Sequence, residues 1–257
     1  MSDTAAARIM RPMPIDLTDR VCLITGADQG IGAAVARGFV ARGAVVVATD
    51  LEPPDPARCG DVALSLAWDV ADPEAARSVI AEVSAKLGRL DAFVANAGIY
   101  PQHDWDELTL EKWRREMSID LDGVWFGMDA ALRPMAEQGY GKIVAVSSVQ
   151  VRRGPVNHIP YTTAKAGLLG LVRSMARAVG PKGVRINAIL PGAVRTETEI
   201  ELYPDQEALA AKLAGQQCLP ARLMPEGIEP TFAFLCAAES DAITGQAICV
   251  DHGLTHW

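Results

Sequence analysis

Three side chains in the second half of the chain have the types and the spacing for proton transfer to or from an alcohol. Tyr161 and Lys165 are four residues apart in a stretch with helical spacing, and Ser148 precedes Tyr161 by 13 residues. Residues four apart lie on one face of a helix, so the ammonium can lie beside the phenol. A phenol has a pKa of about 10, and lowering it to about 7 takes roughly 4 kcal/mol, which nearby positive charge can supply. The same Tyr-x-x-x-Lys spacing also occurs on solvated helix faces.

A glycine-rich turn near the N-terminus has the composition of an anion-binding site. The segment Thr25-Gly26-Ala27-Asp28-Gln29-Gly30-Ile31-Gly32 follows a short apolar run and opens a stretch with helical spacing. Glycine permits positive φ and close approach of the backbone, and the free N–H groups at a helix N-terminus attract a pyrophosphate. A purely structural tight turn would have the same sequence. The placement between strand and helix, with Asp50 20 residues beyond Gly30, favours a dinucleotide site.

Asp50, at the end of the second apolar run, indicates which dinucleotide fits. A carboxylate here can accept hydrogen bonds from both ribose hydroxyls, and it would repel a 2′-phosphate. No Arg or Lys lies within the glycine turn or directly after Asp50, and Asp28 adds another negative charge. These residues favour NAD over NADP, although an Asp at this position can also simply begin a turn.

The candidate residues follow apolar runs that alternate with helical stretches. Strands are expected over 20–25, 44–50, within 62–70, 91–98, 142–148, 184–190 and 246–251, and helices over 73–87, 110–137 and 161–179. The runs are continuously apolar, as in a sheet that is covered on both faces. This alternation predicts a single-domain α/β fold, a Rossmann-type doubly wound parallel sheet of about seven strands with helices on both faces. Ligands bind such a sheet at the carboxyl ends of its strands.

Composition and charge argue against several other classes of protein. The 257 residues are 49% hydrophobic, and a formal net charge of −8 argues against binding to nucleic acid or anionic lipid. Five scattered cysteines without a Cys-x-x-Cys pair are typical of thiols in a reducing cytosol, and they predict no metal site. No apolar run reaches the ~18 residues of a membrane span. We expect a cytoplasmic protein with a flexible tail over 1–16 and one domain over 17–257.

Together these motifs resemble those of the single-domain, NAD-dependent branch of the short-chain dehydrogenase/reductase family. Thr-Gly-x-x-x-Gly-Ile-Gly, Asn96-Ala97-Gly98, Ser147-Ser148, Tyr161-x-x-x-Lys165 and Pro191-Gly192-x-x-x-Thr196 occur in the family's order between Leu17 and about Gly253. The resemblance implies that Tyr161 is the catalytic acid/base, that Ser148 orients the substrate, and that Lys165 binds the nicotinamide ribose and lowers the tyrosine pKa. Thr196 and the backbone at Val194 would hold the carboxamide. The family also implies a homotetramer.

The residues expected to bind NAD combine the glycine turn, the end of the second strand and the positions implied by the resemblance. They are Gly26, Gln29, Gly30, Ile31, Gly32, Asp50, Leu51, Asp69, Val70, Asn96, Ala97, Gly98, Tyr161, Lys165, Pro191, Gly192, Val194 and Thr196.

Two positions depart from the family pattern. Counting seven residues from Trp113 reaches Asp120, where the family usually has an Asn whose main-chain carbonyl holds a water of the proton relay. Asp keeps the carbonyl but places a negative charge near Lys165, so we expect activity with an altered pH profile. Val250-Asp251-His252-Gly253 replaces a common Gly-Gly, and it puts an imidazole near the C-terminus, where it could meet another subunit.

The resemblance leaves the substrate open. Gln150 and His158 flank the catalytic residues together with a polar lid over 195–225, and the favoured substrate is a neutral polyol, sugar or cyclic alcohol. Arg152 and Arg153 could meet a carboxylate or form a solvated basic pair. The expected reaction is reversible oxidation of a secondary alcohol to a ketone with hydride transfer to NAD. Two alternatives remain: an NADPH-dependent ketone reductase of the same fold, and a catalytically silent NAD(H)-binding sensor or scaffold.

Overall fold

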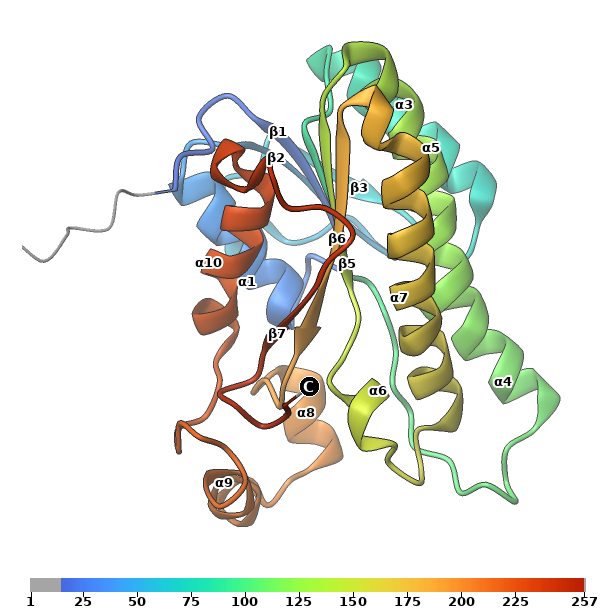
Figure 1. Cartoon of the computed structure of the whole chain (residues 1–257), viewed down its shortest axis with the longest axis vertical. Coiled ribbons are helices and arrows are strands. Elements are labelled where there is room, and N and C mark those ends of the chain that lie inside the picture. The colour runs from blue at the N-terminus through green and yellow to red at the C-terminus, as the bar shows by residue number, and fades with distance from the viewer. Residues whose placement is uncertain (1–14, 257) are drawn as a thin grey trace, which may run out of the picture.

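A parallel sheet of seven strands runs through the centre of the protein, in a computed structural model that describes residues 15–256 (Figure 1). The strands are β1 (Val21–Thr25), β2 (Val45–Asp50), β3 (Leu64–Ala67), β4 (Ala92–Ala95), β5 (Gly141–Val146), β6 (Val184–Pro191) and β7 (Ala247–Val250). Their order is β3-β2-β1-β4-β5-β6-β7. The chain therefore reverses its direction of travel between β1 and β4, which is where such sheets open a crevice. The predicted fold class is confirmed.

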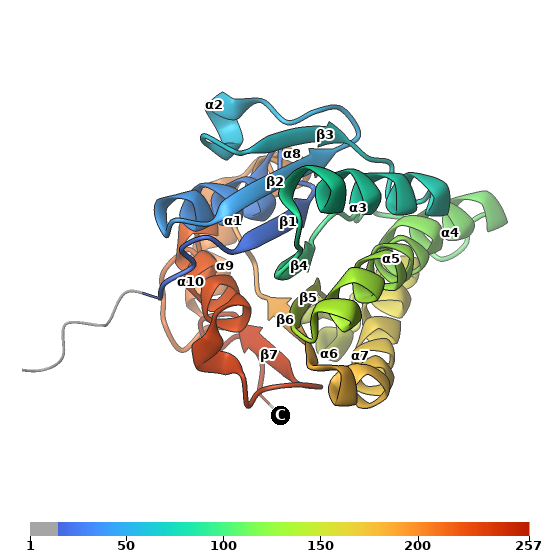
Figure 2. The same ribbon diagram turned by 90° about the horizontal axis from the view of Figure 1, so that it is seen from above.

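Alternate side chains of each strand enter two separate hydrophobic cores. Val21 and Leu23 of β1 belong to one core and Cys22 and Ile24 to the other, and all four side chains are buried. Helices α3 (Pro73–Leu87), α5 (Gly123–Gln138) and α7 (Ile159–Val179) cover the first face, and α1 (Gly30–Ala41) and α10 (Pro225–Cys236) cover the second (Figure 2). Burial on both faces explains why the strand sequences are continuously apolar.

Local signals determine several element ends. The carboxylate of Asp72 accepts the N–H of Glu74 at the start of α3, and Gly88 ends that helix in a left-handed conformation, so the helix has the predicted bounds of 73 and 87. Helix α7 begins at Ile159, two residues before the predicted start. The strands β3, β4 and β7 are shorter than the apolar runs that contain them. The residues of these runs that lie outside the strands form loops, because they have no pairing partner on a neighbouring strand.

The single long helix expected over 110–137 is wrong. The segment consists of α4 (Leu110–Met117), a π-helical turn at Ser118–Asp122, and α5. A π turn holds more residues than an α turn, so it changes which side chains face the neighbouring helix, and such turns are frequent at functional sites. Asp120 lies inside the turn with its side chain fully buried. The interruption therefore occurs at the residue that departs from the family pattern.

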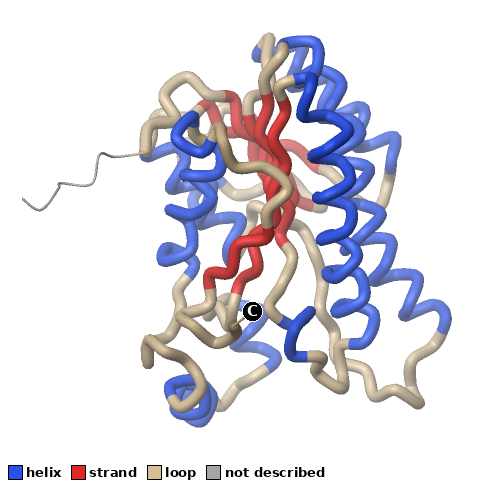
Figure 3. Tube along the Cα trace, in the orientation of Figure 1, coloured by secondary structure: helices blue, strands red, loops and turns tan. Residues whose placement is uncertain are grey.

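The short helices that follow β5 and β6 lie beyond the carboxyl ends of the strands (Figure 3), whereas the one that follows β2 packs beside α1. Helix α2 (Pro56–Cys59) follows β2, α6 (Gln150–Arg153) follows β5, and α8 (Glu197–Leu202) and α9 (Gln206–Ala214) follow β6. The polar lid region expected over 195–225 contains α8 and α9. Of the tail expected over 1–16, only Ile15 and Asp16 lie among the described residues. None of the helices within residues 15–256 is long and apolar enough to cross a bilayer.

Candidate active site

A cavity of about 430 Å³ opens at the carboxyl ends of the strands and brings together motifs that are far apart in the sequence. Every site residue named from the sequence lines it except Gly32 and Asp120. Gly32 packs inside the turn, where a Cβ would lie 2.0 Å from the carbonyl oxygen of Gly26. Asp120 lies behind the wall and acts through Lys165, as described below.

The glycine turn presents backbone N–H groups at the start of α1. Gly26 and Gly30 have φ values of 65° and 54°, which favour glycine. Asn96 holds the turn from the neighbouring strand, because its Nδ2 donates to the carbonyl oxygens of Thr25 and Gly26 at 2.9 and 3.0 Å. The side chain of Asn96 thus supports the shape of the turn, whereas the glycines leave the backbone accessible.

A carboxylate from the lid occupies the glycine turn. Oε2 of Glu197 accepts the N–H of Gly30 at 3.0 Å. Glu197 is the first residue of α8, directly after Thr196, whose methyl group would meet a Cβ on Gly30 at 3.1 Å. Glu197 was not among the site residues predicted from the sequence. The only indication there was its position directly after Thr196, which was expected to contact the cofactor. A negatively charged group therefore already lies at the position where an anion is expected.

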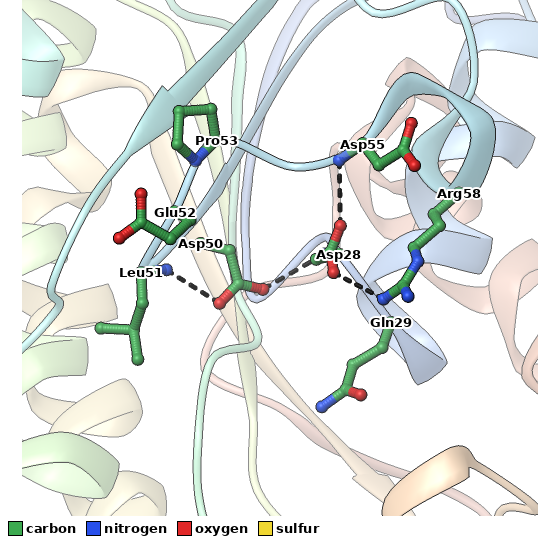
Figure 4. A pocket seen from close by; sticks show the side chains of 8 residues that line it. All are labelled: Asp28, Gln29, Asp50, Leu51, Glu52, Pro53, Asp55 and Arg58. Carbon is green, nitrogen blue, oxygen red and sulfur yellow. Dashed lines mark hydrogen bonds and ion pairs between the residues drawn. The ribbon is translucent and has the colours of Figure 1, made fainter.

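The end of β2 forms a second cavity of about 490 Å³ with an acidic lining (Figure 4). Asp50 accepts the N–H of Asp28 at 3.2 Å and that of Leu51 at 2.9 Å. Arg58, eight residues beyond Asp50, also lines this cavity, and its Nη1 lies 2.7 Å from Oδ2 of Asp28. No Arg or Lys directly follows Asp50 in the sequence, as expected, but helix α2 places the guanidinium of Arg58 in the same cavity. Asp28 engages that guanidinium.

Ser148, Tyr161 and Lys165 converge on one wall of the first cavity. Burial raises the pKa of Tyr161 well above its usual value, hydrogen bonding to the Ser148 hydroxyl lowers it, and the negative charge of Asp120 raises it. Nζ of Lys165 lies 5.6 Å from the centre of the Tyr161 ring. The Ser147 hydroxyl donates to the carbonyl oxygen of Lys165 at 2.8 Å, which anchors α7 against the end of β5. Helix α7 thus holds Tyr161 and Lys165, whereas Ser148 lies in the loop two residues beyond the end of β5.

Asp120 lies beneath this wall. Its Oδ1 is 3.2 Å from Nζ of Lys165 and accepts the N–H of Ile99 at 3.2 Å. Burial raises the pKa of Asp120, and the ammonium of Lys165 opposes that effect. The negative charge expected near Lys165 is therefore in direct contact with it.

The substrate end of the cavity is lined by aromatic and polar side chains. The Tyr161 ring centre lies 5.8 Å from that of Tyr100 and 6.0 Å from that of His158. Gln150 lines the cavity beside Ser148, and its backbone N–H donates to the Ser148 hydroxyl at 3.1 Å. Tyr203 of the lid accepts a hydrogen bond of 2.9 Å from Gln102. These contacts bring α8 against the loop that follows β4.

Three residues considered from the sequence have partners elsewhere. Arg152 donates to Thr255 at 3.4 Å and Arg153 donates to Gln216 at 3.2 Å, and neither lines the cavity. His252 lies 2.9 Å from the carbonyl oxygen of Ala221 through Nδ1. The arginines therefore help to hold the C-terminal segment and the lid. The subunit contact suggested for His252 stays a prediction.

Comparison with known proteins gives consistent matches over nearly the whole chain. A family model described as "Enoyl-(Acyl carrier protein) reductase" matches residues 26–255. The chain is 38% identical to cis-4-hydroxycyclohexanecarboxylate dehydrogenase of Sinomonas cyclohexanicum, over 92% of this chain and 97% of the relative. It is 34% identical to L-rhamnose 1-dehydrogenase (NAD(P)(+)) of Sphingomonas sp. (strain SKA58), over 93% of this chain and 97% of the relative.

Solved structures give the same result. A short-chain type dehydrogenase/reductase from Mycobacterium marinum superimposes with a TM-score of 0.84 at 30% identity, covering 94% of this chain and 97% of the other. Levodione reductase superimposes with a TM-score of 0.86 at 30% identity, covering 92% of this chain and 98% of the other.

Proposed function

Because this chain belongs to the short-chain dehydrogenase/reductase family, we propose that it reversibly oxidises a secondary alcohol to a ketone with NAD as hydride acceptor. One observation carries the proposal. Ser148, Tyr161 and Lys165 meet on one wall of a cavity that extends to the glycine turn and to Asp50. An alcohol at Tyr161 and a dinucleotide on the turn would therefore share one enclosed space.

The proton of the substrate hydroxyl goes to Tyr161. Ser148 hydrogen-bonds Tyr161, so it is placed to hold the same substrate oxygen. The ammonium of Lys165 stabilises the phenolate, and burial of Tyr161 opposes ionisation. A bound NAD would accept the hydride and add positive charge. A base placed and tuned in this way typically contributes a factor of about 10² to 10⁴ to the rate.

The cavity fits a dinucleotide at both ends. The N–H groups of Gly30 and Ile31 and the start of α1 would hold the pyrophosphate, and a Cβ on Gly30 would narrow this space. Asp50 would accept the ribose hydroxyls. Asp69, Val70, Asn96, Ala97 and Gly98 would line the adenine and ribose path, and Pro191, Gly192, Val194 and Thr196 the nicotinamide path.

The choice of NAD over NADP rests on the charge around Asp50. Asp50, Asp28, Glu52 and Asp55 lie in the cavity where a 2′-phosphate would have to enter, and the guanidinium of Arg58 is engaged by Asp28. The L-rhamnose 1-dehydrogenase relative carries NAD(P)(+) in its name, so the family fold accommodates either dinucleotide. A reductase that prefers NADPH is the second candidate, and Arg58 is the residue that favours it.

A neutral cyclic alcohol or sugar is the proposed substrate. Tyr100, Gln150, His158 and Tyr203 surround the space beside Ser148 and Tyr161, and they offer aromatic faces and uncharged hydrogen-bonding groups. The name of one relative refers to a hydroxycyclohexane ring that carries a carboxylate, and the name of another refers to a neutral sugar, so the relatives support the cyclic alcohol and not the absence of charge. We also propose a cytoplasmic homotetramer, for which the 46% exposed ring of Trp125 on α5 supplies apolar surface.

Absorbance of reduced nicotinamide tests the proposed function. The protein is mixed with NAD or NADP and a panel of cyclic alcohols, sugars, polyols and hydroxy acids. We expect turnover with NAD on a cyclic alcohol or sugar. Turnover only with NADPH and ketones would favour the reductase. NADH binding without turnover on the whole panel would favour a silent sensor.

A further inference from the structure

Glu116, on the inner side of α4, is a buried carboxylate that the proposed reaction does not use. Its side chain is 1% exposed, yet it does not line the cavity. Its Oε1 lies 3.1 Å from Nε2 of His103, in the loop after β4. The backbone N–H of Tyr161 is close enough to favour the charged carboxylate. Glu116 thus lies between the catalytic tyrosine and an imidazole that is 14% exposed.

Glu116 is also coupled to Asp120, four residues further along the chain. Burial and the charge of Asp120 raise the pKa of Glu116 to about 7. One oxygen of Asp120, Oδ2, is buried and has no hydrogen-bond partner among the described residues. The groups that face this pair are Lys165 and Tyr161 from α7 and His103 from the loop. Two carboxylates beside one ammonium carry an excess negative charge, which one shared proton would neutralise.

We propose that Glu116 is the proton-exit residue of this site, which receives the substrate-derived proton by way of Asp120 and releases it to solvent through His103. The proposal rests on the proposed oxidation of an alcohol. Glu116 does not touch the substrate and acts on the reaction only through Asp120 and Tyr161.

The protons balance along this path. Each oxidation leaves the proton of the substrate hydroxyl on Tyr161, and one proton must leave before the next turnover. Lys165 gains a proton from Tyr161 and at the same time transfers one of its own to Asp120. Asp120 then passes a proton to Glu116, and Glu116 passes one to Nε2 of His103. The imidazole then releases a proton from Nδ1 to water. No electrons move in this chain. The imidazole is left as the tautomer that is protonated on Nε2, and it returns to its starting tautomer by exchanging protons with water, while every other group is already in its starting state.

A purely structural role for Glu116 predicts a different outcome. A carboxylate near the N-terminus of α7 stabilises that helix through its dipole and would position Tyr161 without transferring protons. Glu116→Gln separates the two roles, because the amide keeps the size and one acceptor oxygen but cannot titrate. Glu111→Gln is the matched control, since Glu111 lies exposed on the same helix.

The pH dependence of kcat/KM and kcat for alcohol oxidation tests the proposal. The wild-type and Glu111→Gln profiles should fall on the acidic side with an apparent pKa of about 7. In Glu116→Gln the component of the acidic limb with an apparent pKa of about 7 should disappear and leave only the component set by Tyr161. The kcat at pH 8 should drop about tenfold, with the NADH dissociation constant unchanged. In His103→Gln, kcat should rise with the concentration of a small buffer that replaces the imidazole. An unchanged limb in Glu116→Gln would overturn the proposal.

Infrared difference spectroscopy of the protein without substrate or cofactor gives a second measurement. The wild-type chain should show a protonated carboxyl band that titrates at about neutral pH, and Glu116→Gln should lack it. If the wild-type protein oxidises an alcohol but lacks this band, the proton exit is overturned and the proposed function stands. This result does not require Glu116→Gln to fold. The band without turnover on any alcohol overturns the proposed function, and the proton exit with it.

Discussion

The carboxylate of Asp120 and the ammonium of Lys165 form an ion pair behind the catalytic wall, with 3.2 Å between Oδ1 and Nζ and both side chains buried. In the proposed reaction Lys165 would stabilise a Tyr161 phenolate, whereas the charge of Asp120 raises the pKa of Tyr161. An uncharged residue at position 120 would remove that second effect.

Asp120→Asn should keep some activity and shift its pH profile, with kcat lowered about tenfold as in Glu116→Gln, because an amide cannot pass a proton to Glu116. Removing the negative charge lowers the pKa of Tyr161, so the pH above which phenolate-dependent oxidation is fast moves downward. The measurement is kcat/KM for alcohol oxidation between pH 6 and 10. Asp122→Asn is a suitable control on the same turn. Identical profiles for Asp120→Asn and the wild type would show that the charge does not matter.

Tyr161→Phe should lose turnover and keep NADH binding. The substitution removes only the hydroxyl that accepts the substrate proton, so we expect a fall in kcat of about 10² or more. NADH binding is followed by fluorescence titration. Retained turnover would remove the role assigned to Tyr161, whereas loss of both turnover and binding would indicate a distorted cavity.

Asp50→Ser should weaken the preference for NAD over NADP. The carboxylate repels a 2′-phosphate, and its loss should reduce the ratio of the two kcat/KM values by about tenfold, or ~1.4 kcal/mol. Glu52→Gln removes a charge from the same cavity without changing the end of β2, and it should have a smaller effect. A ratio that is unchanged in Asp50→Ser would contradict the role of this residue in cofactor choice.

Glu197→Gln should tighten NADH binding. The carboxylate of Glu197 accepts the N–H of Gly30 at 3.0 Å, at the helix N-terminus where the pyrophosphate is expected. A charge at a helix N-terminus contributes about 0.3–1 kcal/mol, so we expect an affinity gain of about two- to fivefold. Isothermal titration of NADH measures this, with Glu201→Gln on the same helix as control. Weaker binding would mean that Glu197 supports the bound state instead.

Glu116→Gln should gain stability relative to the wild type as pH rises. Glu116 has a pKa of about 7 in the folded chain against an ordinary value of 4.5, so the folded state holds a proton that the unfolded state has lost. Between these values the wild type loses up to about 1.4 kcal/mol of unfolding free energy per pH unit from this group, and the variant does not. Urea unfolding at pH 4.5, 6 and 8 measures the difference, which should be flat for Glu111→Gln.

Signals close together in the chain predicted much of the fold and of the site. The Asp72 cap and Gly88 delimit α3, and each of the seven strands lies within an apolar run or extends one residue beyond it. The glycine turn, Asp50, Ser148, Tyr161 and Lys165 line one cavity. These features depend on backbone conformation and hydrophobic periodicity, which short stretches of sequence specify. The π-helical turn at Ser118–Asp122 broke a pattern that looked helical throughout.

The fold class, the order of the motifs and the candidate proton-transfer residues follow from local periodicity and residue type, so they can be predicted from the sequence. Which charges meet depends on the packing of distant segments. Glu197 reaches Gly30 across 167 positions, Arg58 returns to Asp28, and His103 lies against Glu116. Such pairs depend on how helices and loops pack at the carboxyl ends of the strands, where separate elements converge and no local rule sets the distance between them.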